Sequence, residues 1–173
     1  MSDYFKNINE IIYEGPDSDN PLSFKYYDEN RQVLGKTMKE NLRFATCYWH
    51  TFTWPGLDPF GGATFERPWM SSGDPLKMAE MKLDEAFDFF NKIKTSFFCF
   101  HDRDISPEGS NYKETQKNFL YIIDLIQSKM ETSKVKLLWG TANAFSHKRY
   151  MSGASTNPDP EVFAYKAAQV KDC

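Results

Sequence analysis

The sequence predicts an α/β fold in which short strands alternate with longer helices. From about residue 37 onward, a compact apolar run is followed by a polar or Gly/Pro-containing loop and then by a segment with helical spacing. This pattern occurs three times, which is typical of consecutive strand–helix units. The 173 residues are 40% hydrophobic and 16% aromatic, which is enough apolar material for one globular core.

Residues 1–36 precede this pattern and show no sustained hydrophobic period. Turn-forming residues cluster at 15–17 and again at 19–21. We therefore interpret 1–36 as an N-terminal arm and 37–173 as the folded body, which begins with a short helical stretch at 37–41.

The first unit has a predicted strand at 42–48 and a loop that extends to Pro68. The next segment is predicted to be a helix with one apolar stripe, while its lysines and acids are interpreted as a solvated face. The stripe consists of Leu76, Ala79, Leu83, Phe87 and Phe90.

The second unit begins with the strand 97–100, which is apolar throughout, as a parallel strand covered on both faces requires. It continues directly into the motif His-Asp-Arg-Asp at 101–104. Ser110 is the predicted N-cap of the following helix. The buried face of that helix is predicted to comprise Phe119, Ile122, Ile123, Ile126 and Met130.

The third unit has a predicted strand at 135–139 and a loop at 140–157. A third helix should start with Asp159 as N-cap, Pro160 in the first position and Glu161 in the first turn. Its helical pattern continues to Cys173.

Three such units fit either an open doubly wound sheet or a (β/α)8 barrel. The first strand is not followed by GxGxxG, the turn typical of a dinucleotide-binding sheet. Polar and aromatic residues instead follow each predicted strand, where barrel enzymes place their active sites. We therefore expect an incomplete TIM barrel, since a complete one needs ~250 residues and this chain supplies about the first three βα units.

Charge and cysteine content exclude several classes of function. The 21 basic and 24 acidic residues are mixed along the chain, so no nucleic-acid partner is expected. No apolar stretch approaches the ~20 residues of a membrane helix, and the first residues lack a secretory pattern. Cys47, Cys99 and Cys173 show no CxxC spacing, and we interpret them as reduced core thiols of a cytoplasmic protein.

The motif at 101–104 is the sharpest chemical feature. A carboxylate beside a histidine can hold one ring nitrogen and leave the other for proton transfer. His101 could equally be a structural residue at a strand end, and spacing alone leaves both interpretations open. For the aromatic residues near strand ends, packing is the more common role. His50 and His147 are interpreted as structural, and no credible metal site is found.

Five blocks of the sequence together resemble successive blocks of xylose isomerase, in its longer class, in the family's order and spacing. The blocks are RFATCYWHTF (43–52), DPFG (58–61), FCFHDRD followed by SPEG (98–104 and 106–109), LLWGTAN (137–143) and TNPDPEVF (156–163).

The resemblance implies a (β/α)8 barrel that assembles as a homotetramer and interconverts D-xylose and D-xylulose, with glucose and fructose as a second pair. It implies two divalent cations, Mg²⁺ or alternatively Mn²⁺ or Co²⁺, which assist a hydride shift. His101 matches the histidine that assists ring opening, and Asp104 matches the aspartate that orients it.

Four further positions match the family's substrate site. Trp49 corresponds to a wall of the pocket, and Phe60 to an aromatic residue that reaches into a neighbouring subunit. Thr141 and Phe145 correspond to lesser pocket positions. The family's metal ligands match nothing in this chain and are expected beyond Cys173, so the isolated chain is predicted to be inactive and to bind no cation.

Two other hypotheses stay open. The chain could be a non-catalytic remnant or a subunit fragment of the same family. A different barrel enzyme, such as a sugar epimerase or an endonuclease for damaged DNA, is disfavoured by the block-by-block match and the lack of a basic patch.

Overall fold

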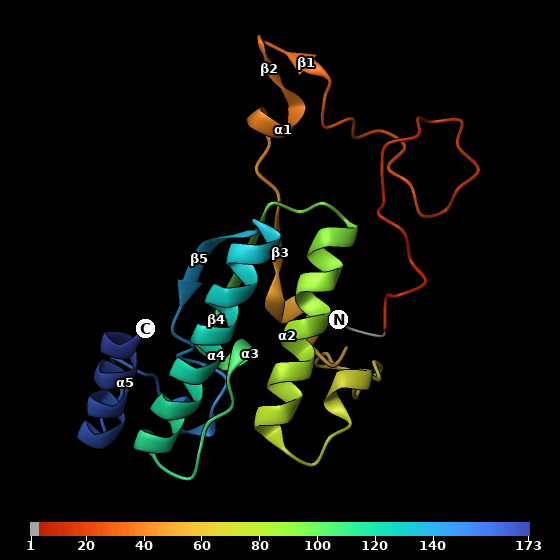
Figure 1. Cartoon of the computed structure of the whole chain (residues 1–173). Helices are drawn as coiled ribbons and strands as arrows, with labels where there is room; N and C mark the ends of the chain where they lie inside the picture. Colours follow the sequence, from red (N-terminus) through yellow and green to blue (C-terminus); the bar gives the residue numbers. More distant parts are fainter. Residues whose placement is uncertain (1–3) are drawn as a thin grey trace.

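The computed structural model describes residues 4–173, and its body is built on a three-stranded parallel sheet (Figure 1). Strands β3 (Ala45–Cys47), β4 (Phe97–His101) and β5 (Lys136–Thr141) lie side by side in chain order. Both pairings are parallel. The predicted α/β fold with consecutive strand–helix units is confirmed.

Three helices follow the three strands. Helix α2 (Pro75–Lys92) connects β3 to β4, α4 (Tyr112–Ser133) connects β4 to β5, and α5 (Pro160–Asp172) follows β5. Helices α2 and α4 run side by side along one face of the sheet (Figure 1). The predicted N-cap of α5 is correct, because the Asp159 side chain accepts a hydrogen bond from the amide of Glu161 at 2.9 Å.

The core lies between the sheet and these two helices. Phe98 of β4 stacks on Phe90 with ring centroids 5.3 Å apart and meets Phe87 edge-on at 5.5 Å. Ile122 and Ile126 from α4 complete the same buried cluster. Burying a side chain of this size stabilises a fold by ~1.5–3 kcal/mol, so the apolar residues 97–100 of β4 contribute strongly to the stability of the body.

The sheet is open rather than closed into a barrel. Every residue of β5 is exposed, including Leu137, Leu138 and Trp139. Within residues 4–173, no strand pairs with the outer side of β3 or of β5. The parallel sheet fits part of a (β/α)8 barrel, but the barrel itself stays a proposal.

Strand boundaries differ from those predicted. The first strand, predicted at 42–48, is only Ala45–Cys47: its pairing with β4 starts at Ala45, and after Tyr48 the chain turns into the π-helix η1 (Trp49–Thr53). Leu42 and Phe44, which precede β3 at the amino end of the sheet, are exposed. The third strand, predicted at 135–139, begins at Lys136 and continues to Thr141.

The predicted N-cap at Ser110 is wrong. Asn111 caps α4, since its side chain accepts a hydrogen bond from the amide of Glu114 at 3.0 Å. The Ser110 hydroxyl donates instead to the Glu114 carboxylate, in a capping-box-like exchange one residue earlier. Two adjacent residues with capping side chains left the sequence ambiguous at this point.

The arm is largely irregular and ends in a small hairpin of β1 (Gln32–Val33) and β2 (Lys36–Thr37). Helix α1 (Met38–Asn41) follows, with Thr37 and Glu40 forming a capping box. The hairpin crosses the proposed division at residue 36, and that division stays a prediction. Residues 1–3 of the proposed arm lie outside the described residues.

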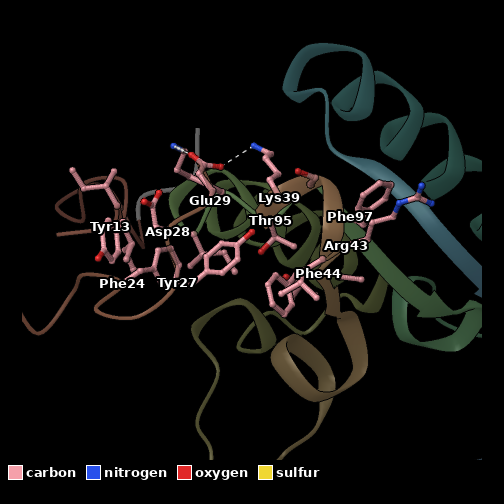
Figure 2. A pocket seen from close by; sticks show the side chains of 18 of the residues that line it. Tyr13, Phe24, Tyr27, Asp28, Glu29, Lys39, Arg43, Phe44, Thr95 and Phe97 are labelled. Carbon is pink, nitrogen blue, oxygen red and sulfur yellow. Dashed lines mark hydrogen bonds and ion pairs between the residues drawn. The ribbon is translucent and has the colours of Figure 1, made fainter. Parts of the chain in front are cut away.

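Two ion pairs of Glu29 connect the arm to the body. The Glu29 carboxylate accepts hydrogen bonds from Lys39 Nζ at 3.0 Å and from Lys94 Nζ, just after α2, at 2.6 Å. The hydrogen bond from Lys94 has the largest effect, and together with the bond from Lys39 it holds the pKa of the Glu29 carboxyl below its usual value. Figure 2 shows this cluster beside a cavity of about 550 Å³ between the arm and the amino end of the sheet.

Replacing Glu29 with Gln should loosen the arm. The change removes two partly exposed ion pairs worth ~0.2–1 kcal/mol each, so cleavage of the arm in limited proteolysis should be about 2- to 30-fold faster. Glu14→Gln is the matched control, because the Glu14 carboxylate accepts hydrogen bonds from Ser18 and Asn20, which both lie within the arm. Equal cleavage rates for the two variants would contradict the role of Glu29.

Candidate functional site

The carboxyl ends of the three parallel strands meet at one edge of the sheet. In register, Cys47 of β3 lies opposite Cys99, and His101 of β4 lies opposite Thr141 of β5. Sheets of this kind collect their functional side chains at this edge. The 550 Å³ cavity lies at the amino end instead, where Phe97 lines it, and it contacts neither His101 nor the loop after it.

A histidine and an aspartate are hydrogen-bonded at this edge. Helix α3 (Asp102–Ile105) starts directly after β4, and this tight turn brings Asp104 back onto His101. Asp104 Oδ2 accepts a hydrogen bond from the His101 amide at 2.8 Å and lies 2.9 Å from His101 Nδ1. Asp104 is 1% exposed, while the His101 side chain is 20% exposed. A carboxylate in this position favours the tautomer with the proton on Nδ1, which leaves Nε2 available for proton transfer.

Two aromatic rings flank the imidazole of His101. Trp139 of β5 meets it edge-on at 5.8 Å, and Phe145 meets it at 5.3 Å with the planes 89° apart. The Asn143 side chain positions Phe145 by accepting a hydrogen bond from its amide at 3.1 Å. Both rings are themselves exposed, Trp139 by 43% and Phe145 by 64%. Phe145 was a predicted pocket position, whereas Trp139 belongs to the aromatic residues near strand ends for which packing was the more common expectation.

Trp49 and Phe60 are not brought to His101. Trp49 is partly buried at the start of η1, and Phe60 is 98% exposed in the following loop. Within the part of the chain that the structure describes, no ring contact joins either residue to His101. Their roles at a substrate site stay predictions.

The other two histidines have ordinary surroundings. His50 is exposed and meets the Trp54 ring edge-on at 6.3 Å. His147 Nδ1 accepts a hydrogen bond from the Arg149 amide at 3.1 Å, so it caps a short 3-10 turn, η3 (Lys148–Tyr150). His147 Nε2 also lies 3.9 Å from the Glu108 carboxylate, and the structural interpretation of both histidines stays a prediction.

A buried network of hydrogen bonds around Asp102 was not predicted from the sequence. Asp102 is 1% exposed, and it accepts hydrogen bonds from the Asn143 amide at 2.7 Å and from Gln169 Nε2 at 2.6 Å. Arg103 pairs with the same carboxylate at 3.1 Å. The network ties the loops after β4 and β5 to helix α5. Nothing in the sequence marks Gln169, since its partner lies 67 positions away.

Lys82 was also misjudged, because the lysines of α2 were interpreted as a solvated face. It is only 9% exposed, and its Nζ donates to the backbone carbonyl of Asp104 at 2.5 Å and to Thr53 Oγ1 at 3.2 Å. Nζ also lies 5.6 Å from the centre of the Tyr48 ring. Burial lowers the pKa of Lys82 to about 8, although the nearby Asp104 carboxylate acts in the opposite direction.

Metal ligands do not converge in the described part of the chain. Among residues 4–173, no group of three or more His, Cys, Asp or Glu side chains is placed to hold an ion. Asp102 is occupied by the donors described above, and Asp104 is engaged with His101 through Oδ2. These two buried carboxylates therefore position protein groups.

The three cysteines are free thiols in different environments. Cys99 is buried, and burial raises its pKa to about 11. Cys47 is partly buried, whereas Cys173 is exposed at the end of α5, so the interpretation as a core thiol is wrong for Cys173. In residues 4–173, none of the helices has both the length and the apolar character required to span a bilayer.

The fold and this edge together define the chain as part of an α/β protein with a His–Asp pair and aromatic walls at the carboxyl ends of parallel strands. No protein-family model matches the chain. It is 59% identical over 170 residues to a xylose isomerase from Photobacterium profundum, covering 98% of the chain and 39% of that protein. It is 58% identical over 168 residues to the xylose isomerase of Paraburkholderia phytofirmans, covering 97% and 38%. A xylose isomerase from Roseobacter denitrificans is 56% identical over 173 residues, covering 100% and 40%.

The chain thus corresponds to an N-terminal portion of xylose isomerase, as the sequence blocks predicted. It spans about two fifths of the length of the curated relatives that it matches.

Proposed function

We propose that this chain forms the N-terminal part of an enzyme that interconverts D-xylose and D-xylulose, with D-glucose and D-fructose as a second pair. In this proposal His101 and Asp104 open the sugar ring. The observation that supports it best is the 2.9 Å contact between His101 Nδ1 and Asp104 Oδ2 at the end of a parallel strand. The relatives' printed name, xylose isomerase, supplies the substrate.

Ring opening requires a proton to be moved. As the bond between C1 and the ring oxygen breaks, the C1 hydroxyl loses a proton and the ring oxygen gains one. His101 Nε2 can accept and return that proton, while Asp104 fixes the ring through Nδ1. Because the Asp104 carboxylate also accepts a hydrogen bond from the His101 amide, it holds both the side chain and the main chain of His101.

The remaining site residues would shape the pocket. Phe145 would shield the reacting sugar from water, and Thr141 lies opposite His101 in the register of the sheet. Trp49 would form a wall, and the 98% exposed ring of Phe60 is suited to a role at a neighbouring subunit of a homotetramer. A complete (β/α)8 barrel and a cytoplasmic location belong to the same proposal.

The cations that the family implies do not fit this chain. No carboxylate cluster among residues 4–173 can hold Mg²⁺, Mn²⁺ or Co²⁺, and we therefore derive no step through them. In the proposal, their ligands come from the part of the enzyme that lies beyond the matched segment.

A chimera tests this function. In it, the chain replaces the matched N-terminal segment of the Photobacterium profundum xylose isomerase, which then supplies the rest of the protein. With Mg²⁺ present, the chimera should convert D-xylose to D-xylulose, and D-glucose less efficiently; the parent enzyme is the control. A folded chimera without activity would favour the non-catalytic remnant instead.

A further inference from the structure

Lys82 is a buried cation beside the candidate site, and the proposed reaction gives it no role. Lys82 Nζ, on α2, reaches the carbonyl oxygen of Asp104 and the hydroxyl of Thr53. The Thr53 hydroxyl bonds to the same carbonyl at 3.3 Å. The backbone carbonyl of Asp104 therefore connects α2, η1 and α3. The carboxylate of the same residue holds His101.

The stability of the fold does not explain a lysine here. The depressed pKa of Lys82 indicates that burial penalises its charged form. Within residues 4–173, no carboxylate lies at ion-pair distance from its Nζ; Asp84 on the same helix pairs with Lys129 instead. Replacing Lys82 with an apolar side chain of similar size removes this cost of burying an unpaired charge.

We propose that Lys82 is a positioning residue for ring opening, which holds the main chain of Asp104 so that its carboxylate meets His101 Nδ1. This inference rests on the proposed function. The neighbouring interactions agree with it, because Asp104 Oδ1 is buried and has no hydrogen-bond partner among the described residues. The carboxylate therefore depends on the placement of its backbone and on Oδ2 for its orientation.

The decisive variant in the chimera is Lys82→Met, which keeps the length of the stem and removes the ammonium group. Small displacements of catalytic groups are costly, so kcat for D-xylose should fall by about 10- to 100-fold. KM should change little, because no sugar contact is lost. Glyceraldehyde, an aldose too short to cyclise, should be isomerised nearly as fast as by the unmodified chimera.

Lys77→Met is the matched control, since Lys77 is an exposed lysine of the same helix and lies outside the site. The melting temperature of the Lys82→Met chimera should equal or exceed that of the unmodified one. A lower melting temperature with equal losses on xylose and glyceraldehyde would mean that Lys82 is merely structural. Unchanged xylose turnover would also overturn the proposal.

A rescue experiment separates charge from volume. In the chimera with Lys82→Ala, added propylammonium should restore part of the xylose activity by occupying the vacated space with a cation. Propanol has the same size without the charge and should restore none. Equal rescue by both compounds, or rescue by neither, would argue against an ammonium group as the positioning element.

A spectroscopic measurement makes the two proposals separable. The His101 Nδ1 proton, hydrogen-bonded to Asp104, should give a downfield NMR resonance in the 173-residue chain and in the chimera, and Lys82→Met should broaden or remove it. An inactive chimera that shows this dependence would refute the proposed function and keep the positioning role. An active chimera whose resonance is unaffected by Lys82→Met would refute the positioning role alone.

Discussion

Replacing His101 with Asn in the chimera should lower the turnover of D-xylose by ~10²- to 10⁴-fold, the usual contribution of general acid–base assistance. Asn cannot shuttle a proton between the C1 hydroxyl and the ring oxygen at neutral pH. The loss should be much smaller for glyceraldehyde, which needs no ring opening. Enzymatic assays of both substrates, with Mg²⁺ in excess, measure the difference.

Asp104→Asn should give a milder defect of the same kind. Its amide can still accept a hydrogen bond, but it lacks the charge that favours a proton on Nδ1. Cation binding should be unchanged in both variants, because the described residues include no metal cluster at this edge. An abolished metal affinity, or equal losses on both substrates, would show that His101 has a different role.

The isolated 173-residue chain should convert no detectable xylose, while the chimera converts it readily. The chain brings the His–Asp pair but no convergent set of metal ligands among residues 4–173. A hydride shift between adjacent carbons without polarisation of the two oxygens is slow, so proton transfer alone is insufficient. An assay with a long incubation at high protein concentration sets the upper limit.

Isothermal calorimetry provides a second readout on the same chain. Mg²⁺ and Mn²⁺ should bind only weakly, as they do to scattered surface carboxylates. The chimera is the positive control. Micromolar binding to the chain alone would contradict our account, because it would require a carboxylate cluster that is absent from residues 4–173.

Short sequence patterns were sufficient to predict most of the helices and the central strand. The stripe from Leu76 to Phe90 predicted α2, and the cap at Asp159 predicted the start of α5, because helix faces and caps are decided within a few residues. The uniformly apolar β4 was similarly evident from its composition.

The N-cap of α4 and the length of the first strand could not be predicted from short sequence patterns. Ser110 and Asn111 both carry capping side chains, and the geometry of the loop selected Asn111. The strand expected at 42–48 is shorter at both ends: pairing with β4 begins only at Ala45, so Phe44 has no partner, and the chain turns into η1 after Tyr48. Pairing of this kind is a non-local property, so an apolar run alone overestimates a strand.

The sequence by itself determined the parallel α/β order and placed His101 and Asp104 at a strand end, three residues apart, where one tight turn joins them. Only the tertiary structure decided which polar side chains support that pair. Lys82 contacts Asp104 across 22 residues of chain, and Gln169 reaches Asp102 across 67. A lysine or glutamine on an amphipathic helix has the same local pattern whether it faces solvent or a buried carbonyl. The difference arises from desolvation and hydrogen bonding after the elements have packed, which no local pattern records.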